Sequence, residues 1–103
     1  ATIVHITTNK KYATNKIYFA KPAEKAEADL IIALQTQSAN RIYFDPSAAD
    51  KTECIYFAHV IGLAKKRVFI SESPDKDTMT VWIDNPNLTL KQRIALLVYL
   101  GKI

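Results

Sequence analysis

The segment Asn15-Lys16-Ile17-Tyr18-Phe19 returns 25 residues later as Asn40-Arg41-Ile42-Tyr43-Phe44. A looser copy, Lys66-Arg67-Val68-Phe69-Ile70, begins 26 residues after the second. Each copy combines β-branched and aromatic residues, which is typical of a β-strand. A period of about 25 residues leaves room for a helix and two turns, which is the length of a β-α crossover unit. The repeat therefore predicts an α/β fold with parallel strands.

The segments between these strands predict two helices. Pro22 stands at the position of a first helical residue, and an apolar stripe follows at helical spacing (Ala26, Leu30, Ala33 and Leu34). Residues 28–34 alone also fit a buried strand, so both interpretations stay open there. A second helix is expected over residues 48–65, where Asp45-Pro46-Ser47 supplies the cap. Its stretch 54–64 is almost entirely apolar, which is typical of a helix that is covered or used as an interface.

Three more elements complete the prediction. Residues 2–7 form the first strand, and the alternating residues 79–83 form another after a polar turn. We expect residues 79–83 to pair with residues 66–70 as an antiparallel hairpin. Thr89 opens a capping box and Gly101 ends a final helix. The core stripe of this helix is expected at four positions (Leu90, Ile94, Leu97 and Val98).

Together these elements make one α/β domain over residues 1–103. We expect a mixed sheet of about five strands with three helices, in the order β-β-α-β-α-β-β-α. The order of the last seven elements resembles the thioredoxin fold or a truncated doubly wound sheet. Lys21-Pro22-Ala23-Glu24 stands where thioredoxins carry Cys-x-x-Cys, so this resemblance implies the topology without dithiol chemistry.

A second resemblance is to nucleoside deoxyribosyltransferase-like and TIR-like proteins. It rests on the order of three segments, residues 16–22, 28–33 and 52–70. In that family a catalytic glutamate follows the threonine of the third segment. Here Ile55 stands at that position, and the nearby Glu53 lies in a different helical register. The resemblance implies a small nucleotide-acting enzyme, which is the weakest of three alternatives for the function.

The residues that carry catalytic or metal chemistry are few. The chain has one cysteine, Cys54, and two histidines, His5 and His59. A single cysteine excludes an internal disulfide and a cysteine-built zinc site. Neither histidine has a neighbouring nucleophile and acid in a known arrangement, so we assign no catalytic residue, no metal ligand and no cofactor.

The hydropathy pattern indicates in which cellular compartment the protein is expected. No apolar run approaches the roughly 18–20 residues of a membrane span. The first residues lack the basic, apolar and small-residue order of a signal peptide. The lone Cys54 suits a reducing compartment. We therefore expect a cytoplasmic protein.

The net charge of +4 is unevenly distributed along the chain. Residues 1–21 and 54–103 are basic, whereas residues 22–53 are acidic. Bases also introduce the repeated strands (Lys16, Arg41, Lys65, Lys66 and Arg67). These five residues predict a basic strand edge that could track a nucleic-acid backbone, although exposed bases at strand starts also serve solubility alone.

The opposite edge, where parallel strands end, is the usual ligand edge of an open α/β sheet. It would carry Lys21, Asp45, Ser47 and Ser71. A cation and helix amino ends there would suit a small anion such as phosphate. This small-anion site is a further alternative.

The leading functional prediction is a non-enzymatic protein-interaction module, a small regulator or inhibitor. It would dock another protein, or a second copy of itself, through the apolar helix 48–65 or a sheet edge. The expected contact residues are Ile55, Tyr56, His59 and Leu63. By analogy, small proteins of phages and other mobile elements that block a host enzyme have this profile. Nucleic-acid binding through the basic edge is the second alternative.

Overall fold

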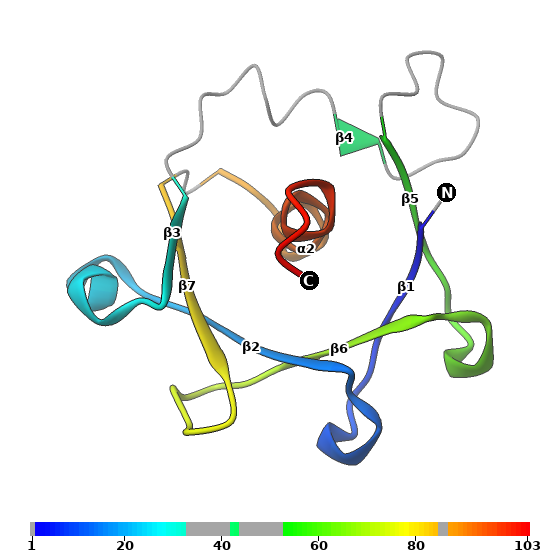
Figure 1. Ribbon diagram of the computed structural model, residues 1–103, viewed down its shortest axis with the longest axis horizontal. Coiled ribbons are helices and arrows are strands. Elements are labelled where there is room, and N and C mark those ends of the chain that lie inside the picture. Colours follow the sequence, from blue (N-terminus) through cyan, green and yellow to red (C-terminus); the bar gives the residue numbers. More distant parts are fainter. Residues whose placement is uncertain (1, 33–41, 44–52, 85–86) are drawn as a thin grey trace.

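The computed structural model describes residues 2–32, 42–43, 53–84 and 87–103. In this part of the chain one α-helix lies in the hollow of a curled sheet (Figure 1). All strand pairs are parallel. The chain is thus a small α/β domain, as the sequence predicts, but with seven strands and one α-helix in the described residues.

The sheet contains β1 (Thr2–Ile6), β2 (Asn15–Phe19), β3 (Leu30–Ile32), β4 (Ile42–Tyr43), β5 (Glu53–Phe57), β6 (Lys66–Ile70) and β7 (Met79–Ile83). Three short 3-10 helices lie in the connections: η1 (Lys10–Tyr12), η2 (Pro22–Glu27) and η3 (Ile61–Leu63). The α-helix α2 (Leu90–Tyr99) follows the last strand. The spatial order of the strands is β3-β7-β2-β6-β1-β5-β4.

Two series of strands alternate across this sheet. β1, β2 and β3 form one series, and β5, β6 and β7 form the other, so each connection within a series passes one strand of the other. β1 and β2 begin 13 residues apart, as do β5 and β6, and β6 and β7. A five-residue strand spans about 17 Å, and eight extended residues reach about 28 Å. An eight-residue connection with a single 3-10 turn can therefore replace a crossover helix.

In the described residues each of these periods therefore contains two strands, with 3-10 helices as the described helical elements. β3 lies between β2 and β4 in sequence, and β5 lies between β4 and β6. The helix predicted over residues 48–65 is wrong in its described part, where residues 53–57 form β5 and residues 61–63 form η3. That segment is apolar on every side because Ile55 of β5 faces the core while Tyr56 faces outward.

Two other local predictions are also corrected. The helix that begins at Pro22 is only the 3-10 helix η2. Of the two interpretations of residues 28–34, the strand is confirmed at residues 30–32 by β3, while residues 33–34 lie outside the described residues. The antiparallel hairpin of residues 66–70 and 79–83 is wrong. β6 and β7 each pair in parallel with β2, which lies between them. The polar loop of residues 71–78 is long enough to pass β2, so the chain enters β7 in the same direction as β6.

The core lies between the inner face of the sheet and α2. Alternate strand residues face inward, and one residue in each of the five longest strands has no exposed surface (Val4, Ile17, Ile55, Val68 and Val81). They form one cluster with Ile94 and Leu97 of α2. The 3-10 helices lie on the outer side of the sheet (Figure 1).

The sequence predicts α2 well. The Thr89 hydroxyl accepts the Gln92 N–H at 3.2 Å, and the Gln92 side chain accepts the Thr89 N–H at 2.8 Å, which completes the capping box. Gly101 adopts a φ of 71° just after the helix, in the left-handed region that favours glycine. Of the predicted core stripe only Leu90 differs, because it is 40% exposed.

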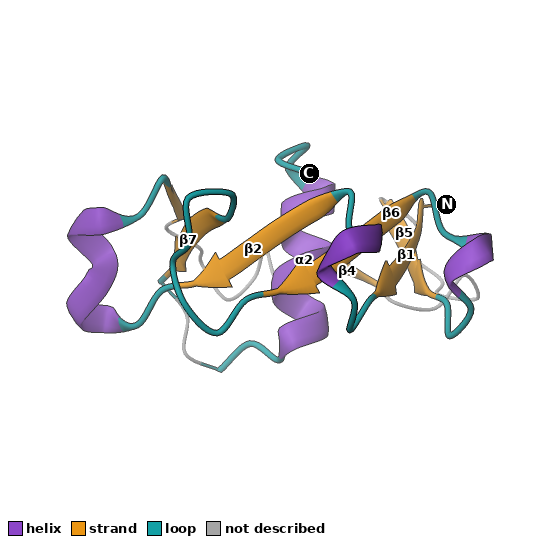
Figure 2. Ribbon diagram, turned by 90° about the horizontal axis from the view of Figure 1, so that it is seen from below, coloured by secondary structure: helices purple, strands orange, loops and turns teal. Residues whose placement is uncertain are grey.

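α2 runs against the direction of the strands (Figure 2). Its first turn therefore lies at the edge of the sheet where the strands end. Three hollows surround this turn, and each is lined by strand-end residues together with Leu90, Lys91 or Arg93.

A partly buried hydrogen bond ties the connection η2 to the outer face of the sheet. The Tyr18 hydroxyl donates to Glu24 Oε1 at 2.7 Å, and the same oxygen accepts the Lys21 N–H at 2.8 Å. The bond to the Glu24 carboxylate raises the pKa of Tyr18. The hydrogen bond from Tyr18, followed by that from the Lys21 backbone, lowers the pKa of Glu24.

The alternation of buried and exposed side chains in β5 gives a first testable prediction. We expect Ile55→Ala to lower the free energy of unfolding by about 2–5 kcal/mol, because it leaves a cavity in the core. Tyr56→Ala, one residue further along the strand, should cost less than about 1 kcal/mol. Urea unfolding of both variants measures this, and equal losses would contradict the strand.

The Tyr18–Glu24 hydrogen bond gives a second testable prediction. In Tyr18→Phe we expect the titration midpoint of the Glu24 carboxyl carbon, followed by NMR, to rise. In the wild type the pair should stabilise the fold above the ordinary glutamate pKa of about 4.3 and below the ordinary tyrosine pKa of about 10. The stabilisation fades as the pH falls through the lowered pKa of Glu24 or rises through the raised pKa of Tyr18. An unchanged midpoint in Tyr18→Phe would show that the bond does not form in solution.

Candidate functional site

The four residues predicted to contact a partner do not share one helix face. Ile55 has no exposed surface and belongs to the core. Tyr56 lies on the outer face of β5 and is 43% exposed, and His59 follows the strand in an exposed position. Leu63 lies in η3 and is 63% exposed. Three of the four residues are thus available to a partner, on a strand and its connection.

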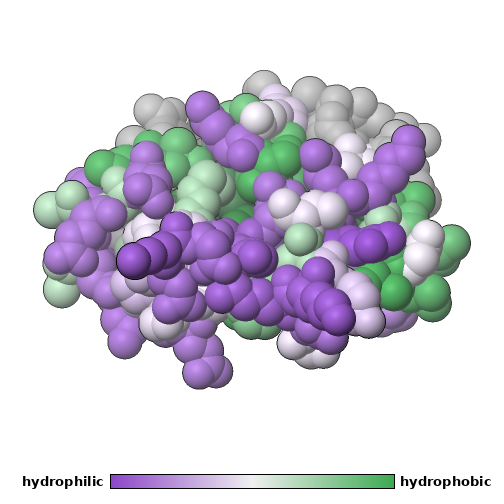
Figure 3. All heavy atoms as spheres, turned by 60° about the horizontal axis from the view of Figure 1, so that its bottom comes forward, coloured by the Kyte–Doolittle hydropathy of each residue, from purple (hydrophilic) through white to green (hydrophobic). Residues whose placement is uncertain are grey.

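These residues lie beside two other exposed apolar side chains. Ile3 of β1 is the register partner of Tyr56 in β5, so both side chains project from the outer face. η3 packs against β1 and begins just after Val60, which is 59% exposed. We call Ile3, Tyr56, Val60 and Leu63 the η3 patch. Hydrophobic residues are visible on the surface at the end of the molecule that carries η3, as they are at other places on this face (Figure 3).

Polar side chains lie beside the apolar ones in the segment that carries Tyr56, Val60 and Leu63. Residues 54–65 contain no acidic residue, and Lys65 and His59 are both exposed. A set of large exposed apolar side chains with a polar rim is typical of a protein-binding surface. The charge of this rim would favour a partner with carboxylates around an apolar centre.

Ile3 and Val60 are not among the contact residues predicted from the sequence. Ile3 belongs to a different strand, and only the parallel register of β1 with β5 brings it beside Tyr56. The signal that could have found it is the 13-residue spacing of the strand starts, because that spacing excludes a crossover helix and places η3 over β1.

The predicted basic edge is divided between different surroundings. The Lys16 ammonium lies 3.1 Å from Asp77 Oδ2, which it shares with Lys10. Lys66 and Arg67 are successive strand residues and point to opposite faces. Arg67 Nε is buried without a hydrogen-bond partner among the described residues. Lys65 is exposed, and Arg41 lies outside the described residues. Binding of nucleic acid at this edge stays a prediction.

The four residues of the predicted small-anion site include two that the structure describes. Lys21 follows β2 and lines one hollow, while Ser71 follows β6 and lines another. The Ser71 hydroxyl donates to the Ser73 carbonyl at 2.7 Å. Asp45 and Ser47 lie outside the described residues. The structure therefore does not bring Lys21 and Ser71 into one site.

The two histidines lie near each other at the edge where the strands end. His5 and His59 line one hollow together with Lys91, and His5 Nδ1 lies 2.8 Å from the Ala58 carbonyl oxygen. The described residues contain no group of three or more histidine, cysteine, aspartate or glutamate side chains that could hold a metal ion. None of the described helices has the length and apolarity needed to cross a membrane.

Comparison of the chain with protein-family models, with curated proteins and with solved structures gives no match.

The pairing of Lys16 with Asp77 has a measurable consequence. The hydrogen bonds from Lys10 and Lys16 lower the pKa of Asp77. We expect Lys16→Gln to raise the titration midpoint of the Asp77 carboxyl carbon in NMR, because one of its two cationic partners is removed. Lys65→Gln, which changes a base of the same predicted edge, should leave that midpoint unchanged. Equal midpoints in wild type and Lys16→Gln would contradict the ion pair.

Proposed function

We propose that this chain is a protein-interaction module, a small regulator or inhibitor, whose docking surface is the η3 patch. The observation that carries the proposal is the exposure of four large apolar side chains, from 36% at Ile3 to 63% at Leu63, on two paired strands and the connection beside them. Scattered exposed apolar residues are ordinary, but a group of neighbours marks an interaction site.

The position of the patch supports this proposal. The fold gains nothing from exposing these side chains, because α2 and the inner face of the sheet already form the core. The patch is held on rigid elements: Ile3 and Tyr56 lie in paired strands, and the Leu63 N–H donates to the Val60 carbonyl at 3.2 Å. A surface that is ordered before binding loses less conformational entropy when a partner docks.

The test is a quantitative pull-down from cell lysate with the wild type and Leu63→Asp, together with light scattering to detect self-association. A central contact residue contributes about 2 kcal/mol or more, so Leu63→Asp should weaken the interaction about 30-fold or more. Leu63 is exposed and its side chain is not part of the core, so the variant should remain folded.

Tyr12→Asp is the matched control. Tyr12 lies in the 3-10 helix η1, which is the counterpart of η3 in the other strand series, and it is 51% exposed. A partner, or a dimer, that is retained by Tyr12→Asp and lost with Leu63→Asp supports the proposal. Equal capture by all three proteins, or no specific capture and a monomer, would overturn it.

A further inference from the structure

The sheet has a notch where β2 ends and its neighbour β7 continues. The last hydrogen bond of the β2–β7 ladder is donated by the Ala20 N–H and accepted by the Val81 carbonyl, at 2.8 Å. The next donor in the ladder would be the N–H of Pro22, which proline lacks. β7 runs on beside β3, held by the Asp84 N–H to Ile32 carbonyl bond at 2.9 Å. The ladder therefore opens into a pocket of about 420 Å³, the β2–β7 notch.

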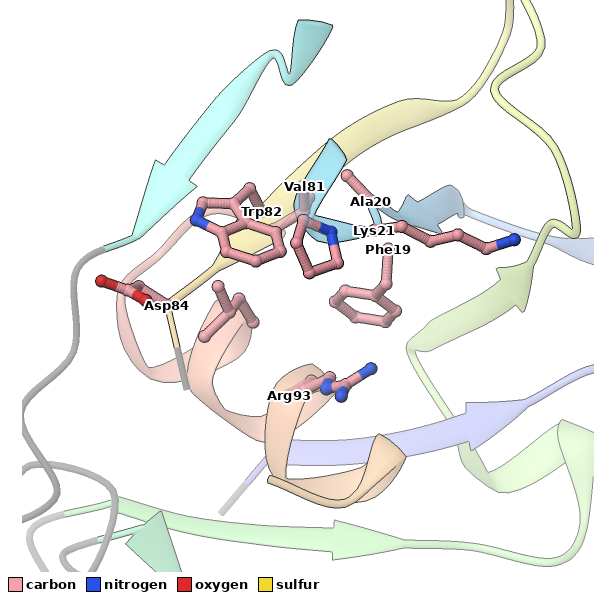
Figure 4. Close-up of a pocket in the computed structure, with 9 residues that line it drawn as sticks. Phe19, Ala20, Lys21, Val81, Trp82, Asp84 and Arg93 are labelled. Carbon is pink, nitrogen blue, oxygen red and sulfur yellow. The ribbon is translucent and has the colours of Figure 1, made fainter. Parts of the chain in front are cut away.

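The wall of this pocket is largely apolar. Phe19 and Val81 line the inner part, and the Trp82 side chain lines the outer part (Figure 4). Pro22 also lines the pocket. The size lies within the range of about 300–1,000 Å³ that small-molecule sites occupy, and such sites combine apolar walls with a few polar groups.

Two charged side chains stand at opposite sides of the pocket. The Arg93 guanidinium lies 5.6 Å from the centre of the Phe19 ring, and no described carboxylate forms an ion pair with it. Asp84 lines the side next to Trp82, away from Arg93 (Figure 4). The Lys21 side chain extends away from the pocket (Figure 4). Arg93 is thus the cation available to a bound anion.

The molecule contains a second notch built from equivalent residues. Where β5 ends beside β1, Phe57 takes the place of Phe19, and the Ala58 N–H donates to the Val4 carbonyl at 2.8 Å. Lys91 lies 5.7 Å from the Phe57 ring centre, as Arg93 does from Phe19. This β5–β1 notch has a volume of only about 140 Å³.

The residue that follows Val4 or Val81 in its strand differs between the two notches. In the β5–β1 notch His5 bonds to the Ala58 carbonyl at 2.8 Å. Its counterpart in the β2–β7 notch is Trp82, whose indole nitrogen is turned away from Ala20 (Figure 4) and is buried without a hydrogen-bond partner among the described residues. The Ala20 carbonyl therefore has no side-chain donor from the described residues, and it remains available to a ligand.

From these features we propose that the β2–β7 notch binds a small anionic ligand with a flat apolar body, of the nucleoside monophosphate class. The phosphate is held by Arg93, whose guanidinium offers paired donors to phosphate oxygens. The base lies against the Trp82 and Pro22 wall, and an amino group of the base donates to the Ala20 carbonyl or to Asp84. This site is independent of the η3 patch.

Trp82 is the only tryptophan of the chain, so its fluorescence reports on this pocket alone. Titration of the full chain with AMP should change the emission saturably. Adenosine and inorganic phosphate, each of which lacks one half of the ligand, should bind at least about 10-fold more weakly, because a hydrogen bond to a charged group is lost or the apolar contact is absent. UMP, whose base has no amino group, should bind more weakly than AMP.

The deciding variants are Arg93→Gln and Lys91→Gln. Arg93→Gln should weaken AMP binding about 10- to 100-fold, whereas Lys91→Gln, the matched change at the β5–β1 notch, should leave it unchanged. Circular dichroism checks that both variants fold. Ligand-observed NMR repeats the comparison without the fluorescent reporter. The proposal is overturned if AMP, GMP, CMP and UMP all fail to bind, or if both variants lose binding equally.

Discussion

The whole architecture depends on the return of the chain over one neighbouring strand within about eight residues. This return is feasible only because the strands are at most five residues long, and it leaves no room for a crossover helix. It also forces the two strand series to alternate. Each connection leaves one strand, passes the neighbouring strand of the other series and enters the next strand of its own series. In the described residues the result is a parallel sheet with 3-10 turns outside and α2 inside (Figure 1).

Much of this fold could be predicted from residue patterns. The strand composition around Ile17 and Val68 and the capping box at Thr89 are local signals, and the structure confirms the elements they predict. The helix over 48–65 failed because periodicity cannot separate a short buried helix from a strand that is apolar on both faces. Ile55 and Tyr56 differ in burial only because α2, which is distant in sequence, packs on one face of β5.

The candidate site was predictable to a similar degree. Local hydrophobicity alone predicts Tyr56 and Leu63 as contact residues, and both are exposed. Ile3 could not be found in that way, because its position beside Tyr56 is set by strand register. Among the described basic residues, Lys66 and Arg67 are separated by strand alternation, and Asp77 from a distant loop lies against Lys16. The properties of a single segment could be predicted from its residues, whereas the neighbours of a residue across the sheet could not.

A fold made of repeated units also repeats its surfaces, and differences between equivalent positions then carry information. Both notches end in a phenylalanine with a base of α2 beside its ring, so these shared features belong to the architecture. Bases in the first turns of a helix are unfavourable, and the first turn of α2 has no acid to offset them. His5 closes one notch with a hydrogen bond, and Trp82 leaves the other open. The open notch is therefore a departure from the repeat that packing alone does not require.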